Sequence, residues 1–441
     1  MALSSQSTKL DTTTTQSGLL HSVFVDGVIN HVRSESITAQ VFQEAGPGDY
    51  ELKGSALSGA ALLQRPGGAM STPTGMLPDH NAPEPQNWST TPVRRHKRVA
   101  VDNLLAQQGM APGAYQDLVP YLFDLFWDAW KDMEIRQSIG GSDGYVCLVL
   151  ARSDSNTVTL KDGYGHASTT PMMFLDVGMN VAWLDASNSY AVGGAAKIDT
   201  LTFPNTINLD SAATWEPGAA TPAVGDPIVF CTTNDPSADY FETEYNAAPN
   251  GLKTLVDPDD ALTTVEGISE DTYPLWAPWR EASSTFDHIE LTEHWRKLAH
   301  KSMSPVTAES HIAITSGAVM SELARSLEGF QMQTSLGQTF EGGYQAVRIA
   351  GRDIAEDTFF YHDILVTLSK EDIFRIPLGA GAGMSSEDGS EWSRLNDQDA
   401  REAYASEYMQ YFTPRRRRHA ALTGISVTNV DADDFSPVPL T

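Results

Sequence analysis

The segment of residues 46–92 is the feature that most restricts the possible folds of this chain. It is rich in glycine and proline, and its apolar residues follow neither the helical nor the strand period. A compact domain rarely contains so long a connection without secondary structure of its own. The segment is therefore either disordered or a long hairpin that reaches out to contact something else.

The clearest predicted element is a helix over residues 114–140. Asp117 is a candidate N-cap, Pro120 is tolerated in the first turn, and Gly140 ends the helix. Apolar and aromatic side chains surround so much of the circumference that we expect neighbours to cover the helix on several sides. The side chains expected to pack are Leu118, Leu122, Leu125, Phe126, Ala129, Trp130 and Met133.

The rest of the chain mixes strand and helix patterns, which predicts an α+β fold. Residues 143–280 contain short β-branched runs separated by turn residues, a pattern typical of a small antiparallel β domain. Further predictions are helices over 291–303, 317–327 and 396–412, strands over 311–316 and 415–427, and a Gly/Ser loop over 379–390.

The charge is strongly acidic and unevenly placed. The chain has 29 Lys and Arg against 57 Asp and Glu, a net charge of −28. Residues 1–110 hold 8 basic against 9 acidic side chains, whereas residues 143–280 hold 5 against 19. So acidic a surface repels nucleic acid and keeps crowded copies soluble, which argues against a sequence-specific DNA-binding protein.

No stretch predicts a membrane span, a secretory signal or a disulfide framework. The longest apolar stretch, residues 118–127, is interrupted by Asp124 and is far too short to cross a bilayer. The first residues lack the basic and apolar regions of a signal peptide. Cys147 and Cys231 are the only cysteines, which fits a reducing compartment.

Motifs for catalysis or cofactor binding are not found, so we expect a protein that is not an enzyme and binds no cofactor or metal. The GAGAG run at 379–383 lacks the dinucleotide-binding spacing. His294 and His300 lie six residues apart, which favours two polar positions on an amphipathic helix over a zinc site. The carboxylate-rich stretch 257–267 lacks the glycine and terminal glutamate of a calcium loop, which leaves open only a loosely held cation.

Two basic clusters stand out against this acidic background, residues 94–98 (RRHKR) and 415–418 (RRRR). Either they balance carboxylates of the same or neighbouring chains, or they contact nucleic acid. If a strand begins within the second cluster, its four arginines alternate between two faces, as two pairs. The candidate inter-subunit or nucleic-acid contacts are Arg94, Arg95, Lys97, Arg98, Arg415, Arg416, Arg417 and Arg418.

An ordered set of short sequences gives the chain a family resemblance. SIGGSDGY ends the predicted long helix, and GLKTLVD and PLWAPW follow the β-rich region. ITSGAVMSELARSLEG, EGGYQAVRIAGRDI and RRRRHAALTGI complete the set. Together they resemble the major capsid proteins of tailed double-stranded DNA viruses, which have the Hong Kong 97-type fold. The resemblance covers residues 18–427 and rests on the order of the parts.

The resemblance implies a division of the chain into the segments of that fold. The long segment without periodicity becomes a loop that lies over an adjacent subunit, and the long helix becomes the spine of a peripheral domain. The implied segments are an N-terminal arm (1–45), an extended loop (46–100), the peripheral domain with its spine helix (101–142), a β-rich insertion and the start of the axial domain (143–280), a second part of the peripheral domain (281–329), a second part of the axial domain (330–390), and a C-terminal helix, strand and acidic tail (391–441).

The resemblance also implies a function and partners. The chain would self-assemble in the host cytoplasm into pentamers and hexamers of an icosahedral virion shell that encloses double-stranded DNA. Implied partners are a separate scaffolding protein, a portal protein at one vertex and non-specifically contacted DNA, while a decoration protein is left open and no membrane is involved. No lysine lies between Lys53 and Lys97, so a lysine cross-link at the loop tip is not expected.

Two alternatives belong to other kinds of protein. One is an encapsulin-like nanocompartment shell. The other is a secreted β-rich binding protein or carbohydrate-active enzyme, which the missing signal and the scarcity of cysteine disfavour.

Overall fold

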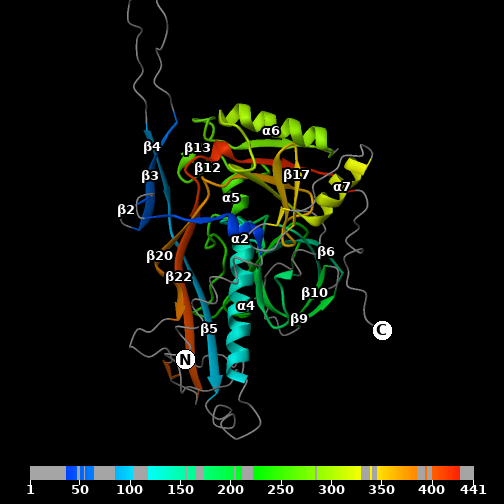
Figure 1. Cartoon of the computed structure of the whole chain (residues 1–441). Coiled ribbons are helices and arrows are strands. Elements are labelled where there is room, and N and C mark those ends of the chain that lie inside the picture. The colour runs from blue at the N-terminus through cyan, green and yellow to red at the C-terminus, as the bar shows by residue number, and fades with distance from the viewer. Residues whose placement is uncertain are drawn as a thin grey trace, which may run out of the picture.

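The computed structural model combines helices with several β-sheets, in agreement with the predicted α+β class (Figure 1). Most of the predicted N-terminal arm and the predicted acidic tail lie outside the part of the chain that the structure describes. The described residues are 36–46, 50–53, 55–63, 85–102, 118–153, 156–163, 173–202, 205–210, 222–283, 286–328, 338–339, 345–384, 393–394 and 400–427.

A seven-stranded sheet forms the centre of the molecule. Helices α6 (His288–Ser302) and α7 (Gly317–Glu328) pack on one face, and α2 (Ile37–Val41), α5 (Leu252–Val256) and the end of α4 (Leu118–Ile139) pack on the other. Its strands, in spatial order, are β14 (Trp279–Ala282), β23 (Ala420–Thr423), β19 (Leu365–Ser369), β15 (His311–Thr315), β18 (Arg352–Glu356), β17 (Gln345–Ile349) and β16 (Gln338–Thr339).

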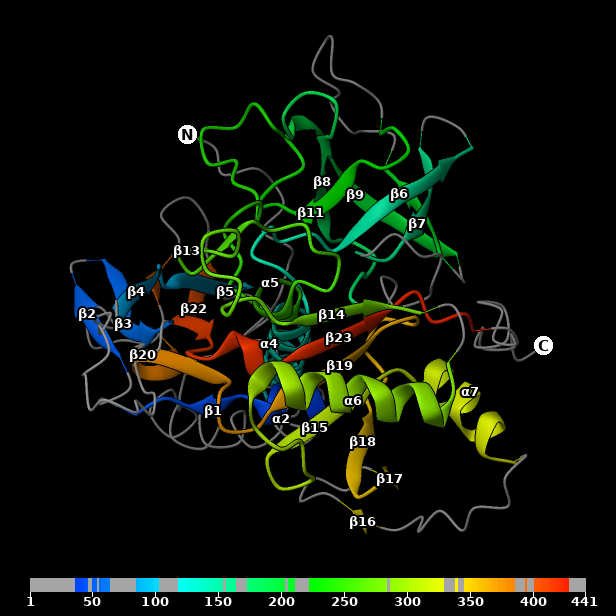
Figure 2. The same ribbon diagram turned by 90° about the horizontal axis from the view of Figure 1, so that it is seen from above.

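Alternation along the central strands explains why both faces of this sheet are covered. In β15, Ile312 and Ile314 pack with α2, α4 and α5, whereas Ala313 between them packs with α6 and α7. The predicted helices over 291–303 and 317–327 and the strand between them are confirmed. Figure 2 shows α6 lying across the sheet, with α7 near one end of it.

A second, elongated sheet runs beside α4 (Figure 1). Its central strand β22 (Ala400–Phe412) pairs with β5 (Val93–Asp102) on one side and with β20 (Phe374–Met384) on the other. The short strands β1 (Gln43–Glu44) and β21 (Ser393–Arg394) complete it. The sheet therefore joins segments that lie about three hundred residues apart in the sequence.

The predicted helix over 396–412 is wrong, because residues 400–412 form strand β22. The acidic start of the segment resembles a helix N-terminus, but the segment is paired with a strand along each edge, and its inner face follows the strand period. Ala405, Glu407, Met409 and Tyr411 are all buried on one face. The predicted loop over 379–390 is also wrong for residues 379–384, which belong to β20 and pair with β22 across a register shift.

The acidic region contains a closed antiparallel barrel, so the strands predicted there are confirmed. Its apolar interior includes Val149, Val158, Trp183 and Ile228. Around the barrel the order is β10 (Thr206–Leu209), β7 (Thr157–Lys161), β6 (Cys147–Arg152), β11 (Pro227–Phe230), β8 (Asn180–Asp185) and β9 (Ala191–Thr202).

Charged contacts fix the barrel region to the end of α4. The Arg136 guanidinium donates to both carboxylate oxygens of Glu244, at 2.8 and 2.7 Å. Lys253 at the start of α5 pairs with Asp143 at 2.9 Å. Because both arginine bonds converge on one carboxylate, they restrain the orientation of the barrel as well as its distance from the helix.

The described ends of the segment 46–92 form an antiparallel hairpin rather than a structureless loop. Strand β3 (Ala56–Leu62) pairs with β4 (Pro85–Thr90) along six positions, and β2 (Glu51–Lys53) adds a third strand. Trp88 of β4 stacks on Phe412 of β22, with ring centroids 4.6 Å apart. The small hairpin of β12 (Thr264–Val265) and β13 (Ile268–Ser269) packs against the same cluster.

The sheets group the chain differently from the predicted segments at two points, and residues 36–45 show a contact that the division did not include. Residues 281–329 and 345–369 belong to one sheet, because β15 pairs with both β18 and β19. Strand β20 lies in the elongated sheet beside α4 rather than with β17 to β19. Residues 36–45 pack within their own chain, since Ile37 and Phe42 are buried in the core below the central sheet.

The buried residues of α4 differ in part from the predicted set. Phe126 and Trp130 are buried as predicted, but Ala129 and Met133 are half-buried. The buried surface also includes Trp127, Ile135 and Ile139. The side chains of Leu118, Leu122 and Leu125 lie outside the described residues. In the part of the chain that the structure describes, no helix has the length and apolar character needed to cross a membrane.

Candidate functional site

The arginine cluster 415–418 forms a single turn of 3-10 helix, η2 (Arg416–Arg418), between β22 and β23. The amide of Arg418 donates to the Arg415 carbonyl at 3.0 Å, and the amide of His419 donates to the Arg416 carbonyl at 2.9 Å. The prediction of a strand with two alternating pairs is wrong here. Around so tight a turn the side chains point in different directions, and the strand begins only at Ala420.

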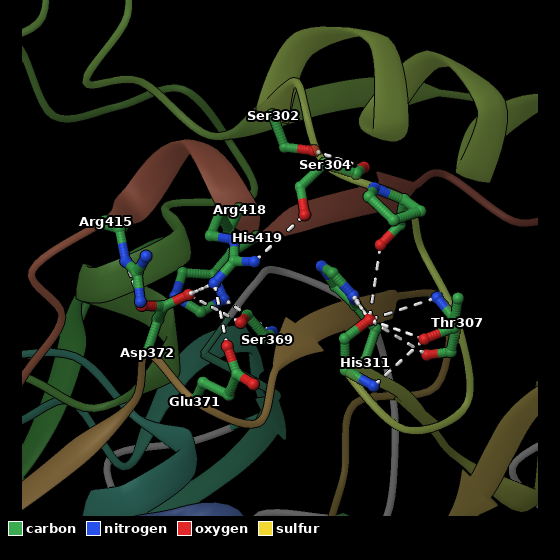
Figure 3. A network of polar contacts seen from close by, with 12 residues as sticks. Ser302, Ser304, Thr307, His311, Ser369, Glu371, Asp372, Arg415, Arg418 and His419 are labelled. Atoms are coloured by element: carbon green, nitrogen blue, oxygen red, sulfur yellow. Dashed lines mark hydrogen bonds and ion pairs between the residues drawn. The ribbon is translucent and has the colours of Figure 1, made fainter.

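Two arginines at the ends of this turn share one buried carboxylate (Figure 3). Asp372 accepts hydrogen bonds from Arg415, from Arg418 at 2.6 Å and from the Ser369 hydroxyl at 2.7 Å. Burial raises the pKa of Asp372, but these donors outweigh it and hold the pKa below its ordinary value. Arg418 also contacts Glu371 at 3.3 Å, so the turn is fixed to the loop after β19.

Arg416 points into the molecule and is fully buried. Its Nε atom donates to the Leu255 carbonyl at 2.6 Å, and its Nη1 atom pairs with Glu270. Glu270 also binds Arg280 at 2.8 Å, and Arg280 pairs with Asp257 at 2.9 Å. Burial alone would raise the pKa of Glu270. The guanidiniums of Arg280 and Arg416 together outweigh this effect and hold the pKa below its usual range.

This network corrects the interpretation of two sequence features. Arg416 contacts carboxylates of its own chain in the interior, so it is not available to a neighbour or to DNA. The stretch 257–267, considered for a loosely held cation, receives the Arg280 guanidinium at Asp257 and Asp260. Among the described residues, no group of three His, Cys, Asp or Glu side chains is arranged to hold a metal ion.

Two buried histidines lie beside the arginine turn. The Nδ1 atom of His419 accepts a hydrogen bond from the Ser369 amide at 3.1 Å, and its Nε2 atom lies 2.9 Å from the Thr413 hydroxyl. The Nε2 atom therefore carries the proton, and the ring is neutral. Burial lowers the pKa of His419 to about 3 and that of His311 to about 4.

The cluster 94–98 lies in strand β5, so its side chains alternate between two faces. Arg95 points toward α4, where it is buried and donates to Glu407 at 3.3 Å and to the Tyr411 hydroxyl at 3.2 Å. Arg375 approaches the same Glu407 at 2.6 Å and Glu134 of α4 at 3.4 Å. Arg95 is thus enclosed by its own chain, and its assignment as an inter-subunit or nucleic-acid contact is wrong.

The other cations of this cluster keep partial exposure. Lys97 lies on the inner face, 5.3 Å from the centre of the Phe126 ring, and burial lowers its pKa to about 8. Arg94 and Arg98 are exposed on the outer face. Arg94 lies over the Tyr408 ring at 5.5 Å, and Arg98 pairs with Glu402 at 2.5 Å. Whether these side chains, Arg415, Arg417 or Arg418 contact other molecules stays a prediction.

Sequence reasoning missed the carboxylates and cations that complete these networks. Glu407 offered a signal, because it is a lone acidic residue at a buried position of an alternating strand. The others come from distant segments, and nothing in the local sequence links them to the arginine clusters. The missed residues are Glu134, Asp257, Glu270, Arg280, Asp372, Arg375 and Glu407.

One further missed residue holds the N-terminal segment in place. The buried carboxylate of Asp357 accepts hydrogen bonds from the Ser36 hydroxyl at 2.8 Å and from the Thr38 hydroxyl at 2.7 Å. It also accepts the Thr38 amide at 3.0 Å. Together these networks attach the start of α2, strand β5 and the C-terminal turn to one body.

Comparison with known proteins gives matches in structure but not in sequence. No protein-family model and no curated protein matches the chain. The capsid asymmetric unit of cyanophage A-1(L) matches with a TM-score of 0.50 and 10% identity, over 89% of this chain and 93% of that one. Mycobacterium phage Patience gives a TM-score of 0.41 and 12% identity, over 95% and 92% of the two chains.

A third match, at lower similarity, is the holo-SrpI encapsulin complex from Synechococcus elongatus PCC 7942. Its TM-score is 0.27 and its identity 10%, over 34% of this chain and 54% of that one. At these identities a match speaks only for the fold, and the cyanophage capsid, which aligns over almost the whole of both chains, carries that conclusion. The chain therefore has the Hong Kong 97-type fold of phage major capsid proteins.

Proposed function

We propose that this chain is the major capsid protein of a tailed bacteriophage, and that it self-assembles into an icosahedral shell of pentamers and hexamers around double-stranded DNA. The observation that carries this proposal is the match to the cyanophage capsid over 89% of this chain and 93% of that one. An alignment of that extent leaves out only about a tenth of this chain.

The shape of the chain supports the same function. The hairpin of β3 and β4 and the elongated sheet extend away from the central sheet (Figure 1). Trp88, Phe412 and Ile268 anchor the base of the hairpin in a buried cluster. A hairpin whose strands are anchored in this way is suited to carry the long connection between them over a neighbouring copy.

The charge distribution supports a role for the barrel region on the outside of the shell. Residues 143–280 carry 19 acidic against 5 basic side chains, and most of the acidic ones belong to the barrel and its connections. An acidic outer surface keeps particles dispersed, whereas a basic inner wall would hold DNA that must be moved during packaging. A shell structure with this barrel buried against DNA would contradict the assignment.

Assembly is the direct test of the proposal. The chain is expressed alone and together with a candidate scaffolding protein from the same genome, and the products are imaged by negative-stain electron microscopy. We expect closed shells of uniform diameter, with the scaffold improving their regularity. A chain that remains monomeric at high concentration in both preparations contradicts the proposal and supports a binding protein or enzyme instead.

The contents of the particles separate a virus from a nanocompartment. Particles from infected cells are treated with nuclease, and the protected nucleic acid and enclosed proteins are identified. We expect long protected double-stranded DNA together with a portal protein. Particles that hold an enzyme and no protected DNA would replace the viral function with an encapsulin-like one.

The shell is proposed to be held together without covalent cross-links. No lysine lies between Lys53 and Lys97, so the tip of the extended hairpin lacks the amine that an isopeptide bond requires. Obligate interfaces of such shells bury roughly 2,000 to 5,000 Å² each, which is enough without covalent bonds. Intact particles that run as a covalent ladder on a denaturing gel would contradict this expectation.

A further inference from the structure

The outer face of the elongated sheet carries a group of arginine and tyrosine side chains beyond the cover of the hairpin base. Where β5 pairs with β22, Arg94 lies opposite Tyr408 and Arg98 opposite Tyr404. Arg94, Arg98 and Tyr408 are exposed, and Tyr404 and Ser406 are half-buried. We call these five residues the arginine–tyrosine face. Figure 1 shows α4 along the opposite side of this sheet.

Strand alternation separates this face completely from the buried ion pairs. Arg95, Glu407 and Tyr411 point toward α4, and Arg95 donates hydrogen bonds to both of the others. The side chains on either side of them in sequence point the other way. The inner cations Arg95 of β5 and Arg375 of β20 stabilise the fold of the chain, whereas Arg94 and Arg98 on the outer face do not cover its core.

The outer side chains are held in place before any partner binds. The Arg94 guanidinium lies 5.5 Å from the centre of the Tyr408 ring, and Arg98 is paired with Glu402 at 2.5 Å. A guanidinium that is already restrained loses less conformational entropy when it contacts a partner. Arginine and tyrosine are also the residues most enriched among those that dominate protein interfaces. This combination is typical of a contact surface and not of a solvated strand.

Charge identifies the partner as a second copy of this chain. The chain has 57 carboxylate side chains and a net charge of −28, so copies repel one another wherever their acidic surfaces meet. An exposed face with two arginines, of which Arg94 is over a tyrosine ring and Arg98 is paired with Glu402, provides a place where a neighbour's carboxylates are attracted instead. Double-stranded DNA is a poorer partner, because proteins that hold it usually neutralise about 6–10 phosphates with a basic surface.

We propose that the arginine–tyrosine face is a contact between copies, in which Arg94 and Arg98 bind carboxylates of a neighbouring chain and Tyr408 packs at the centre. The proposal rests on the proposed shell function and adds to it the surface and the chemistry of one subunit contact. The guanidinium fork suits bidentate binding of a carboxylate, and the tyrosine excludes water from it.

A variant with both arginines removed tests this contact. The chain with Arg94→Gln and Arg98→Gln is compared with one carrying Arg296→Gln and Arg325→Gln, which removes two exposed arginines from α6 and α7. Shell formation is followed by light scattering over a concentration series and by electron microscopy. We expect the protein concentration needed for shell formation to be at least about tenfold higher for the first variant, the usual effect of losing an interface hot spot. The control variant should form shells at the same concentration as the wild type.

Each outcome of this comparison decides the proposal. Equal assembly thresholds for the first variant and the wild type overturn it while leaving the shell function intact. Shells that form normally but no longer retain DNA overturn it in favour of a nucleic-acid contact. A wild-type chain that forms no shell contradicts the shell function and, with it, the contact. Circular dichroism of the variants confirms that the exposed substitutions leave the chain folded.

A cross-linking experiment identifies the partner directly. Arg94→Lys and Arg98→Lys are introduced together, and shells are assembled from equal amounts of chains labelled with light and heavy nitrogen. A carbodiimide then joins each new amine to a carboxylate in contact with it. We expect linked peptides that combine light and heavy halves. Links confined to one isotope, such as those from residue 98 to Glu402 of the same chain, would overturn the proposal.

Discussion

The fully buried guanidinium of Arg416 pairs with Glu270, and its Nε atom donates to the Leu255 carbonyl at 2.6 Å. This contact joins the turn after β22 to the end of α5, which lies some 160 residues earlier in the chain. The most conspicuous cluster of positive charge in the sequence thus places one of its arginines in the interior, where it shares the Glu270 carboxylate with Arg280.

Replacing Arg416 by methionine is expected to destabilise the chain strongly. The substitution retains an apolar stem but leaves Glu270 with Arg280 as its remaining cation, and the Leu255 carbonyl loses its donor. Breaking a buried ion pair costs about 3–5 kcal/mol of unfolding free energy. Urea denaturation of the unassembled chain measures the loss. Arg415→Met, at a half-exposed side chain, should cost about 1 kcal/mol or less, and equal losses at the two positions would contradict the expectation.

The buried side chain of Glu266 makes the chain less stable as the pH rises. This side chain accepts a hydrogen bond from the Thr413 amide at 3.1 Å, and burial raises its pKa to about 8. Between the ordinary glutamate pKa of about 4.3 and this value, the folded chain keeps a proton that the unfolded chain has released. The unfolding free energy therefore decreases as the pH rises through this window and levels off above it.

Glu266→Gln should remove this dependence. The neutral amide retains an acceptor for Thr413 and has no proton to lose, so the variant should become steadily more stable relative to the wild type from pH 5 to pH 8. The difference should change by at most about 1.4 kcal/mol per pH unit. Urea denaturation at several pH values provides the measurement. The exposed Glu293→Gln serves as the control, and a difference that stays constant with pH would rule out a protonated Glu266.

His419 makes the chain less stable as the pH falls, the opposite of the effect of Glu266. Burial lowers its pKa to about 3, so between pH 3 and the ordinary histidine value of about 6.5 the unfolded chain binds a proton that the folded chain does not. Stability is therefore present above about pH 6.5 and is lost as the pH falls toward 3. His311, with a pKa of about 4, acts in the same direction, and Asp372, Arg416 and His311 are the charged groups that influence His419.

The change that tests this slope is His419→Gln, with the exposed His300→Gln as its control. Thermal unfolding is followed from pH 4 to pH 7. We expect His419→Gln to lower stability at pH 7, where the hydrogen bonds to Ser369 and Thr413 are weakened, and to flatten the loss on acidification. An acid slope that is unchanged from the wild type would place the titrating groups elsewhere.

The order of motifs predicted the fold, because it reflects the whole chain rather than any single element. The local predictions failed where pairing between distant segments decides the structure. The segment from Ala400 to Phe412 forms a strand because β5 and β20 bind it on both edges, and its acidic start has no influence on that choice. The helices over 288–302 and 317–328 were predictable because their apolar faces repeat at helical spacing within one segment.

The prediction that basic side chains alternate between two faces was made for residues 415–418, but it holds for residues 94–98. The four arginines after Thr413 lie in a turn, so no alternation develops there. The cluster at Arg94 lies in a strand, where Arg95 is buried and its neighbours Arg94 and His96 are exposed. The sequence could not distinguish the two cases, because the strand state of residues 93–102 depends on pairing with a segment more than three hundred positions away.

The base of the extended hairpin depends on close contact between Gly59 and Trp88. A Cβ atom at position 59 would lie 2.6 Å from the indole ring, so Gly59→Ala should cost about 1–3 kcal/mol through overpacking. Gly163→Ala is the matched control, because its Cβ would meet Tyr361 at an ordinary 3.4 Å. Replacing Trp88 by phenylalanine removes the crowded part of the ring, so this change should cost less in a chain that already carries Gly59→Ala. A double-mutant cycle of unfolding free energies measures that coupling, and strictly additive losses would show that the two residues do not constrain each other.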